Sequence, residues 1–139
     1  MQAPHAPAPA FHFYLRPSAF VGVDGRGEEL PLTAFRGQRA HAVAGIGHPP
    51  RFFATLQALG IECHPHAFAD HHVFNASDMA FDDAMPIVMT AKDAVKCRAF
   101  ARPHWWYLRT EVVVDPCFIA AFDARLAQLP GASRPEAPR

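Results

Sequence analysis

The stretch HAVAGIGHPPRFFATLQALGI, residues 41–61, decides the fold of this chain. Its first five residues form a short apolar run, which predicts a buried strand. Pro49 stands where helices tolerate proline, in their first turn, and Gly60 is a stop signal. Between them, large apolar residues recur at helical spacing, namely Phe52, Phe53, Leu56 and Leu59. A strand followed at once by a helix is the repeating unit of an α/β fold.

The alternation of strands and helices continues toward the C-terminus. Apolar and β-prone runs predict strands at about 62–68, 87–90, 105–108 and 111–114. Helices are predicted after Asn75, after Thr90, which with Asp93 matches a capping box, and after Asp115, where the helix would carry a stripe of Phe118, Phe122, Leu126 and Leu129. This order predicts a mostly parallel sheet flanked by helices.

The amino-terminal segment has a different pattern. Two β-prone runs, at 11–15 and 19–23, precede the dipeptide Asp24-Gly25, which is a strong hairpin turn signal. A return strand near 29–32 would complete a small antiparallel ribbon, which needs other elements to pack on.

These patterns divide the chain into four parts. We expect a β-ribbon or linker at 11–39 and an α/β lobe at 40–129. Six of the 14 prolines lie in the first and last ten residues, which predicts flexible tails at 1–10 and 130–139.

Composition argues against several functional classes. Lys plus Arg and Asp plus Glu number 13 each, so no excess of positive charge indicates a nucleic-acid partner. Three cysteines at irregular spacing suit reduced thiols in a cytoplasmic protein. No apolar run approaches the roughly 18 residues that cross a bilayer. The start lacks the basic and apolar regions of a signal peptide, so we expect a soluble chain.

Titratable side chains crowd into HAFADHHVF, residues 66–74, just after a predicted strand. Ligands of α/β sheets bind at the carboxyl ends of the strands, so Asp70 and His71 are candidate catalytic residues, with the carboxylate orienting the imidazole. A polar loop held together by its own hydrogen bonds is an equal alternative. A metal site would draw on Cys63, His64, His66, Asp70, His71 and His72. No HExxH or paired CxxC supports such a site, so we assign no metal ligands.

Two other motifs are candidates for binding phosphate. Gly45 and Gly47 lie at a strand-to-helix turn, where backbone N–H groups can cradle a phosphate, although the two following prolines favour a tight structural turn. Lys92 and Lys96 lie four residues apart on one face of a predicted helix, and solvated lysines are the ordinary alternative. No GxxxxGK[ST] loop occurs, so a nucleotide enzyme would carry its phosphate-binding half elsewhere.

Several phrases together resemble a known family. In order, HAVAGIGHPPRFFATLQALGI, HAFADHHVF, VMTAKDAVKCRAFA and WWYL resemble the carboxyl-terminal part of the tetraacyldisaccharide 4'-kinases of lipid A synthesis. The family's usual phrases look like AGIGNPxRFF, HxFxDHH or HxFxDHx, and MTEKDAVKC. This chain has His48 where asparagine is usual and Ala91 where glutamate is usual. The resemblance covers about residues 11–129.

The resemblance implies a Gram-negative enzyme that transfers the γ-phosphate of ATP, with Mg²⁺, to the 4'-hydroxyl of a lipid disaccharide phosphate. The enzyme would work at the cytoplasmic face of the inner membrane. Family members are P-loop NTPase relatives with two α/β lobes joined by a β-ribbon. The amino-terminal lobe carries the Walker loop, the acidic base and the membrane-contacting helix. This chain would be the second lobe with the ribbon, inactive alone and holding no tightly bound cofactor.

Site residues follow from the resemblance only where the motifs match. His71 is similar to the family's functionally important histidine, thought to work beside the catalytic aspartate of the other lobe, and Asp70 would orient it. Lys92 and Asp93 match the lysine and aspartate of the TEKD phrase. A stand-alone module that holds a metal or a phosphorylated ligand through its histidines is the alternative function, and a folded remnant without activity is a third.

Overall fold

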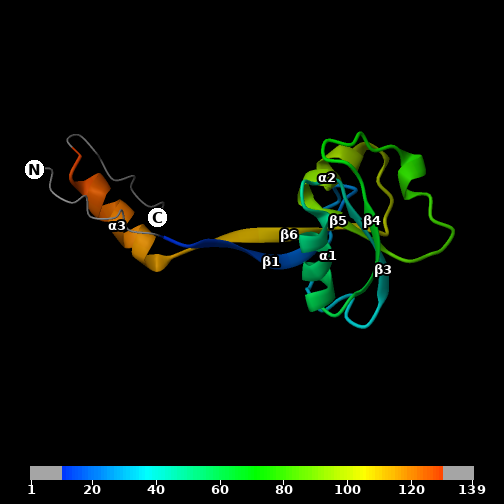
Figure 1. Cartoon of the computed structure of the whole chain (residues 1–139), viewed down its shortest axis with the longest axis horizontal. Helices are drawn as coiled ribbons and strands as arrows, with labels where there is room; N and C mark the ends of the chain where they lie inside the picture. Colours follow the sequence, from blue (N-terminus) through cyan, green and yellow to red (C-terminus); the bar gives the residue numbers. More distant parts are fainter. Residues whose placement is uncertain (1–10, 130–139) are drawn as a thin grey trace, which may run out of the picture. The chain divides into compact units, whose positions relative to one another are not determined.

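Six strands form one mixed sheet in the computed structural model, which describes residues 11–129 (Figure 1). The tails expected at 1–10 and 130–139 lie outside the described residues. The strands are β1 (Phe13–Gly22), β2 (Glu29–Leu30), β3 (Arg39–Ala44), β4 (Glu62–Ala67), β5 (Ile87–Thr90) and β6 (Trp105–Val114). Their order across the sheet is β2-β1-β6-β5-β3-β4.

Helices follow the strands as the alternation predicts. They are α1 (Pro49–Ala58), α2 (Ala91–Cys97) and α3 (Pro116–Ala127), with short 3₁₀ turns η1 (Ala76–Met79) and η2 (Arg98–Phe100). The helix predicted after Asn75 is therefore a single 3₁₀ turn, which Asn75 closes with a complete capping box. Gly60 adopts a φ of +84° after α1, which a glycine reaches at low cost.

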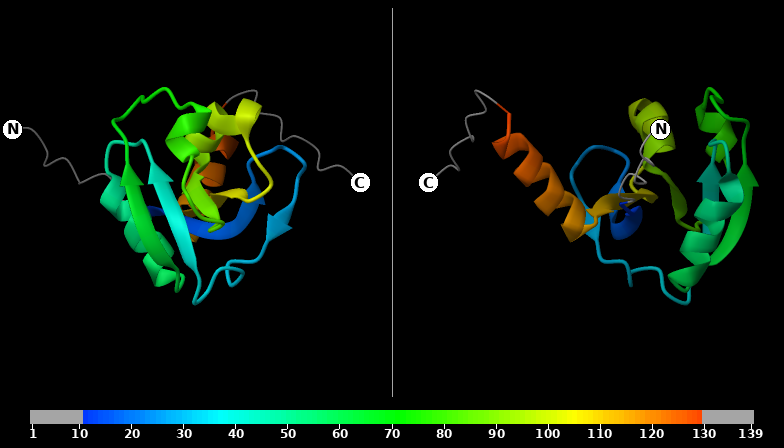
Figure 2. Two further views of the ribbon diagram at one scale, coloured as in Figure 1. Left: turned by 90° about the vertical axis from the view of Figure 1, so that its right-hand side faces the viewer. Right: turned by 60° about the vertical axis from the view of Figure 1, so that its left-hand side comes forward.

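The central strands confirm the predicted fold class. β3 pairs in parallel with both β4 and β5, and β5 pairs in parallel with β6. β1 pairs with β2 in antiparallel fashion, which confirms the amino-terminal ribbon. Figure 2 shows β3 and β4 side by side with α1 alongside them.

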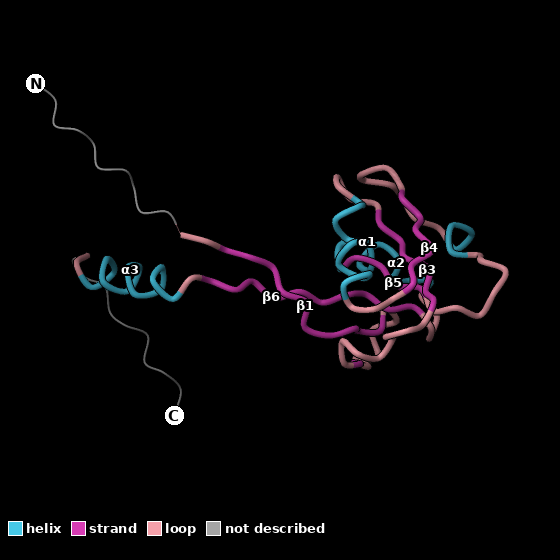
Figure 3. The backbone as a smooth tube through the Cα atoms, turned by 60° about the horizontal axis from the view of Figure 1, so that its bottom comes forward, coloured by secondary structure: helices cyan, strands magenta, loops and turns pink. Residues whose placement is uncertain are grey.

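Two pairs of predicted short strands are instead two long ones. The runs at 11–15 and 19–23 are joined in β1, and those at 105–108 and 111–114 are joined in β6. β1 and β6 are neighbours and run side by side (Figures 1 and 3). The polar interruption in β6 is satisfied across the ribbon, because the guanidinium of Arg109 donates to Ser18 Oγ at 3.0 Å and to the carboxylate of Glu29.

Side chains of β3 alternate between two hydrophobic cores on opposite faces of the sheet. Ala40, Ala42 and Ala44 belong to the core that contains Phe52 and Leu56 of α1. Val43 belongs to the other core, whose remaining buried members are Val23, Phe74, Met79, Ile87, Met89, Ala94, Cys97 and Trp105. A strand buried on both faces is expected in a parallel sheet.

The chain divides into two compact units. One contains Pro17–Glu111 and holds both cores. The described part of the other consists of 11–16 and 112–129, with Phe118 of α3 packed edge-on against Phe11 and Phe13. The predicted stripe of α3 is solvent-accessible: Phe122 is 53% exposed and Leu129 is 56% exposed. No helix within 11–129 has the length and apolar character of a membrane span.

Leu56→Ala should destabilise the chain by about 2–5 kcal/mol, because Leu56 is fully buried between α1 and the sheet. Urea unfolding followed by the fluorescence of buried Trp105 and Trp106 measures this loss. Leu126→Ala on α3 is the matched control, since this leucine is 40% exposed, and it should change stability by less than about 0.5 kcal/mol. Equal losses in the two variants would contradict the assignment of the core.

Candidate functional site

The predicted site residues come from three loops at one edge of the sheet. Gly45 and Gly47 follow β3, Asp70 and His71 follow β4, and α2 with its lysines follows β5. Because β3, β4 and β5 are parallel, their carboxyl ends meet at the same edge. This edge is where ligands of α/β sheets bind.

Asp70 is the centre of the polar contacts at this edge. Its Oδ1 lies 3.3 Å from Lys92 Nζ and accepts the backbone N–H of His71 at 3.1 Å. The hydrogen bond from Lys92 is the main cause that holds the pKa of Asp70 below its usual value. A Cβ placed on Gly47 would lie 3.9 Å from Asp70 Oδ2, so the glycine turn passes beside the carboxylate. Asp70 is therefore ionised at neutral pH.

His71 has an unusual backbone. Its φ of +63° lies in the left-handed region, where it is the only non-glycine residue within 11–129. Such conformations cluster at functional sites, because the surrounding structure has to offset their cost. The imidazole Nε2 lies 3.7 Å from Asp70 Oδ2, and the side chain is 82% exposed. The ring is thus oriented beside a carboxylate and open to a reactant.

The next histidine has a structural role instead. His72 Nε2 lies 3.0 Å from Asp78 Oδ2, and its ring packs against those of Phe68 and Phe74. This hydrogen bond is the main cause that lowers the pKa of Asp78. The Asp-His-His triplet therefore separates into one exposed imidazole and one that fastens the loop to η1.

Lys92 and Lys96 share a helix but differ in their surroundings. Lys96 Nζ lies 3.5 Å from the His72 carbonyl, 3.8 Å from Asp93 Oδ1 and 5.7 Å from the centre of the Phe74 ring. Lys92 contacts Asp70 and keeps 53% of its side chain exposed. Lys92 is the more accessible of the two for a ligand.

Asp93 is a buried residue whose structural role the sequence analysis missed. One carboxylate oxygen, Oδ2, accepts the N–H of Gly45 at 2.8 Å and the hydroxyl of Thr90 at 2.8 Å. Thr90 Oγ1 caps α2 by accepting the N–H of Asp93, as the capping box predicts. The Thr-x-x-Asp pattern predicts the helix cap at Thr90. It does not predict that the carboxylate of Asp93 also contacts Gly45, 48 residues away in the sequence. Since the Gly45 N–H is engaged, a phosphate cradle at this turn cannot use it.

Gly45 also packs closely against its neighbours. A Cβ at this position would lie 3.0 Å from Phe74 Cζ and 3.3 Å from Asp93 Oδ1. This distance to Phe74 supports the reading of the Gly45 turn as a tight structural element.

His64 and His66 form a second cluster with residues that the sequence analysis did not select. The buried His41 places Nδ1 2.9 Å from His66 Nε2 and Nε2 2.9 Å from Asp83 Oδ2. Both rings stack on Phe81, and His64 lies edge-on to His41. Burial is the main cause that lowers the pKa of His66, followed by the nearby charges of His41 and His64. Within 11–129 no three His, Cys, Asp or Glu residues are arranged to hold a metal ion.

Comparison with known proteins identifies the family. The sequence profile of LpxK, described as tetraacyldisaccharide-1-P 4'-kinase, matches residues 1–127. The chain belongs to this family. Tetraacyldisaccharide 4'-kinases of Pseudomonas paraeruginosa and Pseudomonas aeruginosa PAO1 are 52% and 50% identical to it over 124 residues. One from Pseudomonas putida W619 is 52% identical over 127 residues, which are 90% of this chain and 38% of that protein.

This chain matches only part of each relative. The alignments to the first two Pseudomonas kinases cover 88% of this chain and 37% of each relative. The LpxK crystal structure from Aquifex aeolicus, solved in complex with ATP, superposes with a TM-score of 0.63 at 21% identity. That superposition covers 89% of this chain and 38% of the LpxK chain. It confirms that the fold is that of one part of an LpxK protein.

Asp93→Ala should cost about 2–5 kcal/mol of stability, because it leaves the buried Gly45 N–H and the Thr90 hydroxyl without their acceptor. Urea unfolding measures the loss. Asp70→Ala is the matched control at the same edge, and its exposed pair with Lys92 predicts almost no shift of the midpoint. A similar shift in both variants would mean that the buried carboxylate of Asp93 contributes no more to stability than the exposed carboxylate of Asp70.

The stability of the chain should fall between pH 7.5 and pH 5.5, and His66 should account for part of the fall. Its pKa in the folded chain lies below the 6.5 of a free histidine, so the unfolded chain takes up the proton first as the pH falls. Urea midpoints at a series of pH values should therefore drop more steeply in the wild type than in His66→Gln. Parallel curves for the two proteins would rule out this contribution.

Proposed function

We propose that this chain is the carboxyl-terminal part of a tetraacyldisaccharide 4'-kinase and contributes one half of its active site. The 4'-hydroxyl of a lipid disaccharide phosphate would be the acceptor, as the names of the related kinases indicate. Support comes from the partial coverage of those relatives, 37% of their length, and from a sequence without a GxxxxGK[ST] loop. The chain alone would then be catalytically incomplete.

His71 is the residue that we assign to proton transfer. The observation that carries this assignment is its exposed imidazole, held in a left-handed conformation beside the ionised Asp70. Phosphoryl transfer needs a group that positions the attacking hydroxyl and accepts its proton. Asp70 would orient the ring, Lys92 would keep Asp70 ionised, and a carboxylate of the missing part would work on the other side of the hydroxyl.

ATP and Mg²⁺ do not fit the described residues of this edge. The Gly45 N–H is engaged by Asp93, the Asp70 carboxylate is engaged by Lys92, and Lys96 is held by His72 and Asp93. A triphosphate needs a row of free backbone N–H groups and a lysine, and its metal needs free carboxylate or hydroxyl ligands. We therefore place ATP and Mg²⁺ on the part of the enzyme that this chain lacks.

The missing part would also cover the apolar side of α3. A groove of about 390 Å³ runs along this helix. It is lined by Phe11, Phe118, Ala121, Phe122, Arg125, Leu126 and Leu129. Large accessible apolar patches mark surfaces that bind another protein surface. The relatives are more than twice as long as the matched segment, which supplies a partner of suitable size. Contact with the cytoplasmic face of the inner membrane would belong to that partner.

This chain alone should show no kinase turnover on tetraacyldisaccharide 1-phosphate with ATP and Mg²⁺. Replacing the matched 124 residues of the Pseudomonas aeruginosa kinase by the corresponding residues of this chain should retain activity. Turnover by the isolated chain at an ordinary kinase rate would overturn the proposal. An inactive but folded chimera would contradict it as well.

In the active chimera, His71→Ala should lower kcat by about 10² or more, because general acid–base groups contribute this much. His104→Ala is the matched control, since His104 is an exposed histidine next to the amino end of β6. It should leave kcat unchanged. If His71→Ala also leaves kcat unchanged, the Asp70–His71 pair has only a structural role.

A further inference from the structure

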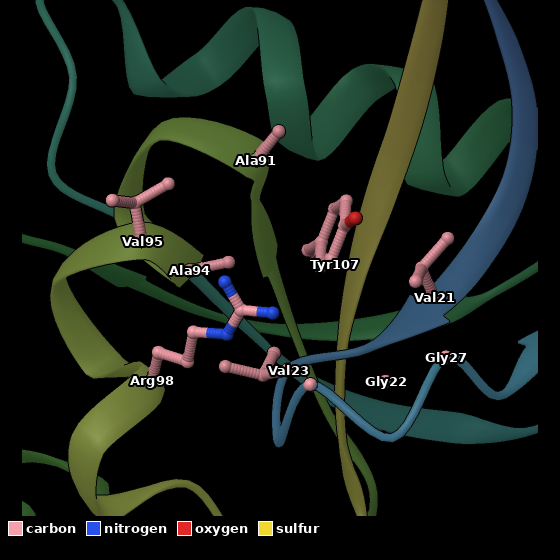
Figure 4. Close-up of a pocket in the computed structure, with 10 residues that line it drawn as sticks. Val21, Gly22, Val23, Gly27, Ala91, Ala94, Val95, Arg98 and Tyr107 are labelled. Atoms are coloured by element: carbon pink, nitrogen blue, oxygen red, sulfur yellow. The ribbon is translucent and has the colours of Figure 1, made fainter.

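A cavity of about 320 Å³ lies between the β1–β2 turn and α2 (Figure 4). Its walls are mainly aliphatic side chains and glycine backbone, with the ring of Tyr107 from β6. The lining residues are Val21, Gly22, Val23, Gly25, Gly27, Ala91, Ala94, Val95, Arg98 and Tyr107. None of them is among the site residues described above. The volume lies at the lower end of the range for small-molecule sites.

Within 11–129, Arg98 is the only charged residue that lines this cavity. Figure 4 shows its side chain reaching from the end of α2 toward Tyr107. A Cβ on Gly25 would lie 2.9 Å from both Nε and Nη2 of Arg98, so the guanidinium rests directly against the backbone of Gly25. Gly25 adopts a φ of +79°, which further favours glycine at this position. The β1–β2 turn therefore lies against the guanidinium of this exposed side chain.

The guanidinium of Arg98 has no hydrogen-bond or acidic partner within 11–129. The nearby Arg26 differs, because its Nε lies 3.6 Å from Asp24 Oδ2. Asp24 also accepts the N–H of Arg26, so the acidic group of the turn is already engaged. Among the residues that the structure describes, the cavity lining thus has one cation, no anion and an apolar wall.

We propose that this cavity binds a small molecule in which an oxyanion is attached to an apolar body. A guanidinium presents a planar fork of N–H donors that matches a phosphate or a carboxylate. Valine side chains and the Tyr107 ring would bury the apolar body. The guanidinium lies beside both the Gly25 backbone and the apolar wall, so one ligand can contact the charge and the apolar side chains together. This inference is independent of the kinase assignment.

Titration of the 139-residue chain with phenyl phosphate tests the proposal, with the amide signals of Gly25 and Gly27 followed by NMR. Inorganic phosphate lacks the apolar body, and phenol lacks the charge. Each should bind at least about tenfold more weakly than phenyl phosphate, because each loses one of the two contributions. Benzoate is the carboxylate probe, and its affinity relative to phenyl phosphate assigns the preferred oxyanion. Equal binding of phenyl phosphate and inorganic phosphate, or no binding of any probe, would overturn the proposal.

Variants locate the binding. Arg98→Gln should weaken phenyl phosphate by about tenfold or more, since a charge-assisted pair is lost. Arg26→Gln, on the same turn but already paired with Asp24, should leave the affinity unchanged. Gly25→Ala should also weaken binding, because the added methyl group displaces the guanidinium. Equal affinity in the wild type and Arg98→Gln, or equal losses for Arg98→Gln and Arg26→Gln, would place the binding elsewhere.

Discussion

The carboxylate of Asp93 is the contact on which the candidate site at this edge of the sheet depends. It is fully buried and joins the turn after β3, through the Gly45 N–H, to the start of α2, through the Thr90 hydroxyl. The first turn of α2 then carries Lys92, which binds Asp70. Three loops from separate parts of the chain are thereby held in one arrangement. The cost of burying this carboxylate is offset by two donors at Oδ2 and by the ammonium of Lys96, 3.8 Å from Oδ1.

Local patterns predicted most of the fold. Proline and glycine signals located α1, capping residues located α2 and α3, and the alternation of elements indicated the parallel sheet. Sequence patterns failed where contacts with another strand decide the structure. The polar Arg109 lies between two predicted strands. Its guanidinium donates hydrogen bonds to Ser18 and Glu29 of the ribbon, so β6 continues through this position.

The histidines illustrate the same limit within the candidate site. Proximity in sequence grouped His64 and His66 with the triplet, although both lie within β4 on the face that contacts His41, before the loop that carries the triplet. Register decides the grouping, since His41 pairs with His64 across β3 and β4 and brings His66 into contact. Asp83 contacts His41 from a loop more than 40 residues away, and no local sequence pattern predicts that contact. Asp70 and His71 were predictable because they are adjacent; their catalytic roles and the domain boundary near residue 40 stay predictions.

The backbone of His71 has a consequence for the evolution and engineering of this protein. A left-handed conformation costs a histidine about 1–2 kcal/mol relative to glycine. Selection for thermal stability alone would therefore favour glycine or asparagine at this position. A histidine at this position is therefore an argument for the catalytic role that we propose for His71. Libraries screened for melting temperature without an activity screen would be expected to lose the imidazole early.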